Sequence, residues 1–364
     1  MKALMLPAVL AGLLGCVAVW CSAAPVPQPP VPKEVATLRG HENGIVGLAF
    51  SPNGKTLASA GHVNDAARLW DVESGKCLRT IKGHGPDKHF GWVQVNGIDF
   101  SPDGQTVATC SYDGTVRVWD AATGKEARVI GTGGIPCTVR FGPGGQTLAW
   151  GAEPGAHLWD LATGKEIGVL DAGVAGTVCG RPVCHFTTAG KLLIAGGPKA
   201  SEPGSFTVWD LDTPGRSLAF RGHPDPVEGW IKWAHDVDIS PDGKFVASSG
   251  DDKVVRLWDM ATTREIAAFD QQPLWPRQVR FSADGSILAV EVTPDHNGFE
   301  NPNVVRFLAV PGGRVLGSVE EKLGPNTAMA FSPDGRYFAA AYTVDKIKEV
   351  IKVWRLPDAW RKKK

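Results

Sequence analysis

Short hydrophobic runs recur along the chain, and each one ends in a four-residue turn of similar composition. The first run ends at Phe50 and is followed by Ser51-Pro52-Asn53-Gly54. Proline presets φ and glycine accepts a positive φ, so this sequence suits a tight turn between two antiparallel strands. The six later turns are Ser101-Pro102-Asp103-Gly104, Gly142-Pro143-Gly144-Gly145, Thr187-Thr188-Ala189-Gly190, Ser240-Pro241-Asp242-Gly243, Ser282-Ala283-Asp284-Gly285 and Ser332-Pro333-Asp334-Gly335.

An aromatic residue follows each turn at the end of what reads as a third strand. These residues are Trp70, Trp119, Trp159, Trp209, Trp258, Phe307 and Trp354. A repeat of roughly 40 to 50 residues with four short strands is typical of a β-propeller blade, which cannot bury both of its faces alone. We therefore predict an all-β, seven-bladed β-propeller with four-stranded antiparallel blades, whose strands we call a to d in chain order.

Dipeptides at fixed places in the repeat connect this pattern to a known family. Trp-Asp pairs end strand c in five units, as at Trp119-Asp120, and Gly-His pairs open three, as at Gly83-His84. In these features the chain resembles the WD40-repeat family over almost all of residues 34–356. The resemblance implies a hydrogen-bonded structural tetrad in two units, made of His84, Thr109, Asp113 and Trp119, and of His223, Ser248, Asp252 and Trp258.

The two ends of the repeat region predict how the ring closes. After Trp354 too few residues remain for a fourth strand, whereas residues 34–41 match the outer strands that precede Gly83-His84 and Gly222-His223. The N-terminal strand should therefore complete the last blade and leave no open seam. We predict a propeller over residues 34–358 and a basic tail over 359–364.

The N-terminus has the pattern of an export signal. Lys2 precedes an apolar run, and Cys21-Ser22-Ala23 offers small residues for cleavage before Ala24. We expect a signal peptide over 1–23, a Pro-rich linker over 24–33, and an exported protein of the periplasm, cell envelope or medium. Two alternatives stay open: a lipoprotein anchored at Cys16, and an uncleaved membrane anchor.

Charge and cysteine content limit which ligands the protein binds and how its fold is stabilised. The chain has 38 basic and 38 acidic residues, which argues against a duplex nucleic-acid binder. Five cysteines lie beyond the export signal, an odd number that excludes a complete intrachain disulfide framework. Cys184 falls at a core position of strand a; a disulfide between Cys179 and Cys184, or haem attachment at Cys184-His185, are the alternatives.

Charged residues also precede the strand a anchors in neighbouring units. Asp99 and Arg140 form one such pair, and Asp238 and Arg280 form another. Strand a is innermost in a propeller, so we predict partly buried ion pairs between blades near the channel. An acid/base pair in an active site would use the same residue types, but the repetition favours a structural role.

The chain contains no linear motif for catalysis, phosphate binding or metal binding, so we expect no cofactor and no enzymatic activity. Length varies mainly in the b–c and d–a loops, which share one face, and loops on a rigid scaffold commonly carry function. We expect a monomeric protein-interaction scaffold. The alternatives are a propeller that binds carbohydrate or a small ligand, and a hydrolase or lyase.

Aromatic residues in these loops are the candidate partner-binding residues, because such residues dominate binding energy at interfaces. Some of them should instead pack beneath their own loops. The candidates are Phe90, Trp92, Trp230, Trp233, Trp275, His296 and Phe299.

Overall fold

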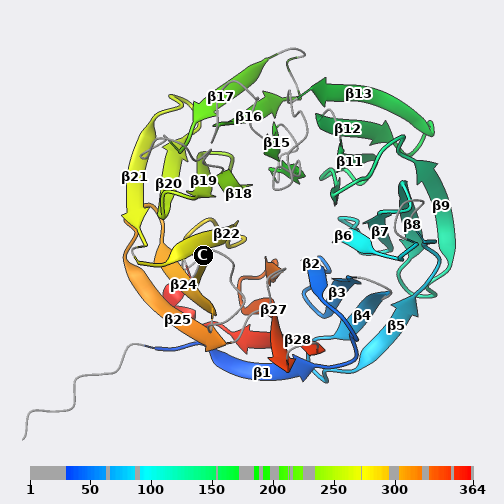
Figure 1. Ribbon diagram of the computed structural model, residues 1–364, viewed down its shortest axis with the longest axis horizontal. Coiled ribbons are helices and arrows are strands. Elements are labelled where there is room, and N and C mark those ends of the chain that lie inside the picture. The colour runs from blue at the N-terminus through cyan, green and yellow to red at the C-terminus, as the bar shows by residue number, and fades with distance from the viewer. Residues whose placement is uncertain are drawn as a thin grey trace, which may run out of the picture.

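The computed structural model consists of β-sheets arranged in a ring (Figure 1). The residues that it describes are 30–62, 66–86, 91–152, 155–171, 184–187, 192–196, 205–211, 213, 216–223, 234–271, 273–294, 303–321, 328–345 and 348–361. Their strands form seven antiparallel sheets of four strands each. The all-β class and the four-stranded antiparallel blades predicted from the repeat are confirmed.

The first four blades follow one another along the chain, each in the order a, b, c, d. Blade one comprises β2 (Ile45–Phe50), β3 (Thr56–Gly61), β4 (Ala67–Asp71) and β5 (Cys77–Ile81). Blade two comprises β6 (Val95–Phe100), β7 (Thr106–Ser111), β8 (Thr115–Asp120) and β9 (Glu126–Gly131). Blade three comprises β10 (Thr138–Phe141), β11 (Thr147–Ala152), β12 (Gly155–Asp160) and β13 (Lys165–Asp171). Blade four comprises β14 (Cys184–Phe186), β15 (Leu192–Gly196), β16 (Ser205–Asp210) and β17 (Ser217–Arg221).

The last three blades complete the set. Blade five comprises β18 (Ala234–Ile239), β19 (Phe245–Gly250), β20 (Val254–Asp259) and β21 (Glu265–Asp270). Blade six comprises β22 (Trp275–Phe281), β23 (Ile287–Thr293), β24 (Asn303–Ala309) and β25 (Val315–Glu321). Blade seven comprises β26 (Met329–Phe331), β27 (Tyr337–Asp345), β28 (Lys348–Arg355) and β1 (Lys33–Leu38). A short 3-10 helix, η1 (Asp358–Trp360), follows β28.

The ring closes through the innermost strands and through β1. Each innermost strand contacts that of the next blade, and β26 of blade seven contacts β2 of blade one. The N-terminal strand β1 pairs antiparallel with β28, with Leu38 opposite Ile351. Figure 1 shows this junction as a blue strand outside a red one. The N-terminal strand therefore completes the last blade, as the sequence predicts.

The repeated turn sequence makes the same hairpin in successive blades. In blade two the Gly104 N–H donates to the Ser101 carbonyl over 2.8 Å, and Asp103 accepts hydrogen bonds from the Ser101 hydroxyl and the Gln105 N–H. Gly104 has a φ of +71°, which an L side chain rarely adopts. The Ser-Pro-Asp-Gly sequence thus fixes the a–b turn through its own side chains.

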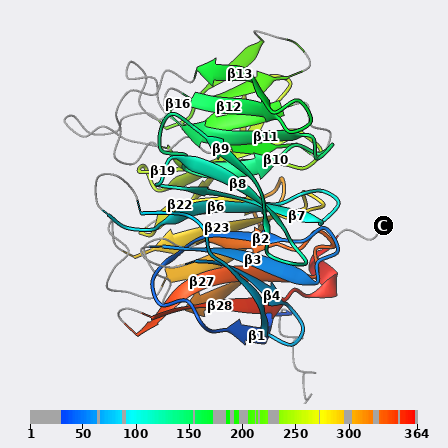
Figure 2. The same cartoon turned by 90° about the vertical axis from the view of Figure 1, so that its right-hand side faces the viewer.

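The hydrophobic core lies between blades, not within them. One cluster joins Ala58 and Leu69 of blade one to Ile98 and Trp119 of blade two. Another joins residues of blade seven, including Leu38, to residues of blade one. Removing this apolar area from water holds neighbouring blades together. Figure 2 shows the stacked sheets from the side.

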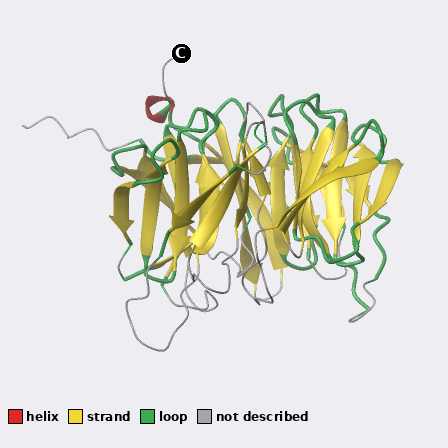
Figure 3. Ribbon diagram, turned by 90° about the horizontal axis from the view of Figure 1, so that it is seen from above, coloured by secondary structure: helices red, strands yellow, loops and turns green. Residues whose placement is uncertain are grey.

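The two faces of the ring differ in their connections. The a–b and c–d turns lie on one face, and the b–c and d–a loops lie on the other; η1 projects on the first of these, as seen edge-on in Figure 3. Of the helices in the described ranges, none is long and apolar enough to cross a membrane.

Candidate functional site

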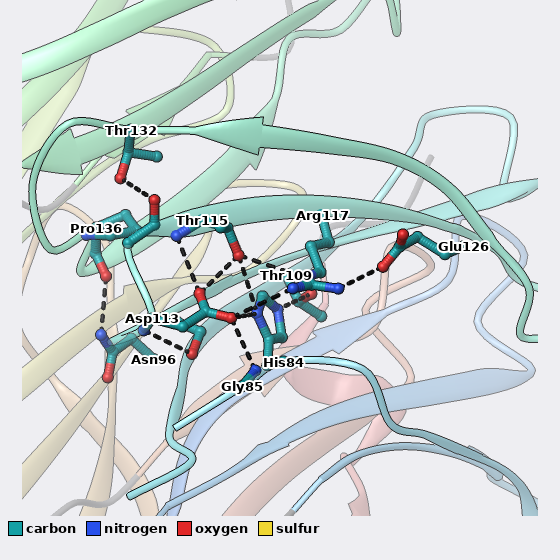
Figure 4. A network of polar contacts seen from close by, with 12 residues as sticks. His84, Gly85, Asn96, Thr109, Asp113, Thr115, Arg117, Glu126, Thr132 and Pro136 are labelled. Atoms are coloured by element: carbon teal, nitrogen blue, oxygen red, sulfur yellow. Dashed lines mark hydrogen bonds and ion pairs between the residues drawn. The ribbon is translucent and has the colours of Figure 1, made fainter. Parts of the chain in front are cut away.

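The tetrad of blade two is a continuous chain of hydrogen bonds, and Figure 4 shows three of its members, His84, Thr109 and Asp113. The indole Nε1 of Trp119 donates to Thr109 Oγ1 over 2.7 Å, and Thr109 Oγ1 lies 2.7 Å from His84 Nε2. The other imidazole nitrogen of His84, Nδ1, lies 3.0 Å from Asp113 Oδ2. Because the ionised Asp113 carboxylate can only accept, Nδ1 of His84 carries the proton, and the Thr109 hydroxyl donates to Nε2 while it accepts from Trp119.

Electrostatics reinforce this network. Burial alone would raise the pKa of Asp113, but the hydrogen bond from His84 holds it well below its usual value, and Thr115 and the Gly85 N–H add further hydrogen bonds. Arg117 Nη2 lies 3.6 Å from the Asp113 carboxylate. Every polar end of the tetrad is thus engaged inside the blade, as suits a structural element.

Blade five repeats the arrangement. Trp258 Nε1 donates to Ser248 Oγ over 3.0 Å, and His223 contacts Ser248 Oγ at 3.0 Å and Asp252 Oδ1 at 2.8 Å. Burial lowers the pKa of His223, although Asp252 opposes the shift. The four residues implied by the resemblance are therefore hydrogen-bonded together here too.

Blade one contains a related network that the sequence reasoning missed. Trp70 Nε1 donates to Ser59 Oγ over 2.8 Å, and Ser59 Oγ lies 2.6 Å from His41 Nε2. Arg68 contacts the remaining imidazole nitrogen at 2.7 Å. The signal was present in the sequence, since Gly40-His41, Ser59 and Trp70 occupy the same places in their repeat as the tetrad residues of blade two.

Blade three replaces the polar network with aromatic packing. Trp150 stands where blades one and two have Ser59 and Thr109, because each of the three pairs with an equivalent residue of strand c. The Trp150 ring stacks on His157 with centroids 5.6 Å apart and planes 3° from parallel. A tryptophan at the centre of the network explains why this unit has no Gly-His pair.

The predicted ion pair between Asp99 and Arg140 needs correction. The two residues lie on neighbouring innermost strands, as expected, but Asp99 accepts its hydrogen bond from the backbone N–H of Phe141 over 2.8 Å. Arg140 Nη1 donates to the Val139 carbonyl over 2.9 Å. Burial raises the pKa of Asp99, and Arg140 opposes the shift through its charge. Each of the two side chains forms its hydrogen bond with a nearby backbone group and not with the other side chain. The sequence alone cannot show this choice of partner.

The predicted pair of Asp238 and Arg280 is also wrong in its partners. Arg280 forms its ion pair with Asp236, which additionally accepts a hydrogen bond from the Val279 N–H over 3.0 Å. Asp238 instead accepts from the Phe281 N–H over 2.7 Å and lies 3.1 Å from His185 Nδ1. Asp236 and Asp238 lie two residues apart in β18 and pair in regular register with Ser249 and Ala247, so both carboxylates face the same side and the sequence cannot show which of them reaches Arg280.

Burial controls the protonation of this inner cluster, which we define as His185, Asp236, Asp238 and Arg280. It raises the pKa of Asp238 to about 6 against the attraction of Arg280, and it raises the pKa of Asp236 as well. Burial also lowers the pKa of His185 well below its usual value, so the imidazole is neutral near pH 7. The contact of His185 with Asp238 is therefore not an ion pair at that pH.

The structure places two of the predicted partner-binding aromatics. Trp92 precedes β6 and is 47% exposed. Trp275 begins β22, is half-buried, and has Lys253 Nζ 4.3 Å from its ring centroid. These residues belong to blades two and six, which are not neighbours. The remaining candidates lie outside the described residues: Phe90, Trp230, Trp233, His296 and Phe299.

A small cleft opens on the same face and is lined in part by Val93, the residue that follows Trp92. It has a volume of about 280 Å³ and lies between blades one and two. Its lining includes Glu42, Arg68, Lys82 and Val93, so both signs of charge meet an apolar side chain there. Such a lining suits a polar partner surface.

Metal and cysteine chemistry find little support in the described part of the chain. No group of three or more histidine, cysteine, aspartate or glutamate residues there could hold a metal ion. Cys184 is buried in β14, and burial raises its pKa to about 12, which suits a core thiol. Its candidate disulfide partner, Cys179, lies outside the described residues.

Comparison with known proteins agrees with the repeat pattern. Residues 32–71, 75–120 and 215–259 match the family described as WD domain, G-beta repeat. Nuclear distribution protein PAC1 of Arthroderma otae is 29% identical over 230 residues, which are 62% of this chain and 38% of that protein. PAC1 of Candida dubliniensis is 23% identical over 287 residues, 73% of this chain and 50% of that protein.

A plant protein matches to a similar extent. The transcriptional corepressor LEUNIG_HOMOLOG of Arabidopsis thaliana is 27% identical over 232 residues, 63% of this chain and 26% of that protein. The chain thus spans between a quarter and a half of the length of these relatives.

Proposed function

Because this chain carries WD40 repeats, we propose that it is a non-catalytic protein-interaction scaffold that binds its partner on the face of the d–a and b–c loops. The relatives support the general role, since one is named a nuclear distribution protein and another a transcriptional corepressor. The tetrads support it as well, because their polar groups are used within the blades.

The observation that carries the binding face is the exposure of Trp92 beside the charged cleft. A tryptophan that is 47% exposed retains much of its apolar surface for a partner. Truncating an aromatic anchor of this kind costs about 2 kcal/mol or more of binding energy. The adjoining Glu42, Arg68 and Lys82 offer charges for the rim of an interface.

A capture experiment tests this face. Immobilised wild-type protein, the Trp92→Ala variant and a Leu78→Ala control are each exposed to cell extract, and captured proteins are quantified by mass spectrometry. Leu78 is 44% exposed but lies on the outer strand β5. We expect Trp92→Ala to lose more than tenfold of a partner that the control retains, with unchanged melting temperatures. Equal capture by both variants would exclude Trp92 from the interface.

The same cleft supports a second candidate function, the binding of carbohydrate or another small polar ligand. Its volume of about 280 Å³ admits a sugar ring, and Trp92 offers an aromatic surface nearby. A glycan array separates the two functions: ligand binding that Trp92→Ala abolishes, without protein capture, favours this alternative. A propeller hydrolase or lyase would be detected by substrate profiling.

We also propose that the protein is exported and monomeric. The export proposal depends on the apolar run and small residues before Ala24. Mass spectrometry of the mature N-terminus tests it: a chain that begins at Ala24 supports cleavage, a lipid on Cys16 supports anchoring, and an intact Met1 contradicts both.

A further inference from the structure

At one position of the outer strands, the size of the side chain differs sharply between blades. This position faces the groove between neighbouring blades, on the side of the a–b and c–d turns. Strand register identifies the equivalent residues: Arg79 pairs with Leu69 in blade one, Arg128 with Val118 in blade two, and Gly168 with Leu158 in blade three. Two consecutive arginines are thus followed by a residue without a side chain.

The two arginines extend over their grooves to the next blade. Arg79 Nε donates to the carbonyl of Ala122 in blade two over 2.9 Å. Arg128 reaches towards the c–d turn of blade three, where its Nη1 lies 3.4 Å from the place that a Cβ on Gly164 would take. Each guanidinium therefore bridges the gap between its own blade and the next.

Among the described residues, none bridges the groove between blades three and four. A Cβ added to Gly168 would meet none of their atoms within 4 Å. The space above it has a volume of about 530 Å³. Its lining is mainly apolar and includes Leu158, Ile167, Phe186, Trp209 and Leu211.

The equivalent groove between blades six and seven shows what can occupy such a space. Gly317 pairs with Phe307 and so corresponds to Gly168. The indole of Trp360, from η1, lies against it: a Cβ on Gly317 would be 2.8 Å from two atoms of that ring. Trp360 is only 8% exposed, and its ring centroid lies 5.4 Å from that of Phe307.

The two grooves have matching walls. Strand register places Leu308, and not Phe307 as the sequence pattern predicts, at the position of Trp159. Leu158 therefore corresponds to Phe307, Ile167 to Leu316, Phe186 to Phe331 and Leu211 to Leu356. In the occupied groove these residues pack in one cluster with Trp360. The open groove therefore presents the same apolar walls around a space that, in the other groove, a tryptophan fills.

A positive charge at the edge of the open groove favours an acidic residue next to the side chain that would bind in the groove. Arg216 lies at the edge of the open groove with a side chain that is 61% exposed, 3.7 Å from Asp210. An exposed guanidinium favours a nearby carboxylate. In the occupied groove, Asp358 stands two residues before Trp360.

We propose that the groove between blades three and four is a docking site for a partner protein segment that inserts a tryptophan side chain above Gly168 and places an acidic residue near Arg216. The site is separate from the loop face proposed above. The groove is specific for an aromatic side chain because Gly168, at its base, has no side chain. A flat ring therefore fits between the apolar walls, where a larger residue at position 168 would exclude it.

The chain supplies its own probe for this site. A labelled synthetic peptide of residues 356–361, Leu-Pro-Asp-Ala-Trp-Arg, is titrated against the full chain by fluorescence anisotropy. We expect saturable binding that falls more than tenfold in Gly168→Arg, which reproduces the arginine bridge of blades one and two. Val169→Arg is the matched control, because its side chain leaves the opposite face of the same strand and adds the same charge.

Two further measurements make the test decisive. Ile167→Asp is a second variant, for use if Gly168→Arg does not fold. Ile167 lies at the rim of the groove and is 57% exposed, so we expect Ile167→Asp to fold and to weaken peptide binding. A peptide with alanine in place of tryptophan should not bind. Equal binding to wild type and Gly168→Arg, or no binding to wild type, overturns the proposal. A wild-type dimer in solution that Gly168→Arg abolishes would instead assign the groove to a second copy of this chain.

Discussion

The ion pair of Asp236 and Arg280 provides the sharpest test of the inner cluster, through the substitution Asp236→Ala. The Asp236 carboxylate accepts hydrogen bonds from the Arg280 guanidinium and from the Val279 N–H. Asp236 is 6% exposed, and the Arg280 side chain is 19% exposed. Alanine would leave a mostly buried cation and a buried amide without their acceptor.

The expected cost is large because both donors lose a partner that water cannot easily replace. Breaking a buried ion pair from one side costs about 3 to 5 kcal/mol. Asp238 remains close enough to attract Arg280, which favours the lower end of that range. We therefore expect Asp236→Ala to lower the free energy of unfolding by about 3 kcal/mol.

Two comparisons isolate the cause. Asp238→Ala leaves Arg280 paired but removes the acceptor of the Phe281 N–H and the partner of His185 Nδ1, so it should cost about 2 kcal/mol. The double variant Asp236→Ala, Arg280→Leu removes both charges and should recover part of the loss, since apolar replacements of buried pairs are often neutral.

Urea unfolding followed by tryptophan fluorescence measures these differences. The reasoning fails if Asp236→Ala costs less than 1 kcal/mol, if Asp238→Ala is the more damaging of the two, or if the double variant is less stable than Asp236→Ala alone. Any of these outcomes would mean that the Arg280 guanidinium is solvated or has another acceptor.

Three other changes probe different parts of the ring. Thr109→Val should cost about 2 to 3 kcal/mol in urea unfolding, because Trp119 Nε1 and His84 both lose a buried partner; a cost below 0.5 kcal/mol would contradict the tetrad's structural role. Burial raises the pKa of Glu349 to about 7, so its contribution to stability is present below pH 4.5 and is lost as pH rises to 7. Glu349→Gln should therefore gain about 2 to 3 kcal/mol relative to wild type between pH 4.5 and 8, and a constant difference would refute this. Deleting residues 33–38 should cost several kcal/mol, whereas an unchanged melting temperature would show that β1 does not hold the ring.

The repeated turn and strand pattern was sufficient to predict the blades and the closing strand. Ser-Pro-Asp-Gly turns act through local hydrogen bonds, so their outcome follows from sequence. The tetrad in blade two was implied by the resemblance to the WD40-repeat family, carried over to the matching repeat positions.

The inner cluster could not be predicted in the same way. The position before the strand a anchor assigned Arg280 to Asp238, but Asp236, two residues earlier on the same side of β18, is the carboxylate that pairs with it. Gly168 gave no signal either, because its meaning depends on which residues of other blades stand at the equivalent position. The choice between two nearby carboxylates, and an unfilled space between two blades, can be identified only from the structure.

The pairing of β1 with β28 has a consequence for how the protein is made. Leu38 and its partner Ile351 are separated by about 300 residues, which a ribosome adds in about 15 to 60 s at 5–20 residues per second. Throughout synthesis the first strand has no partner, and once β28 emerges its free edge can accept any extended segment. The ring can therefore close only after β28 has been synthesised, so the first strand of the chain takes part in the last pairing.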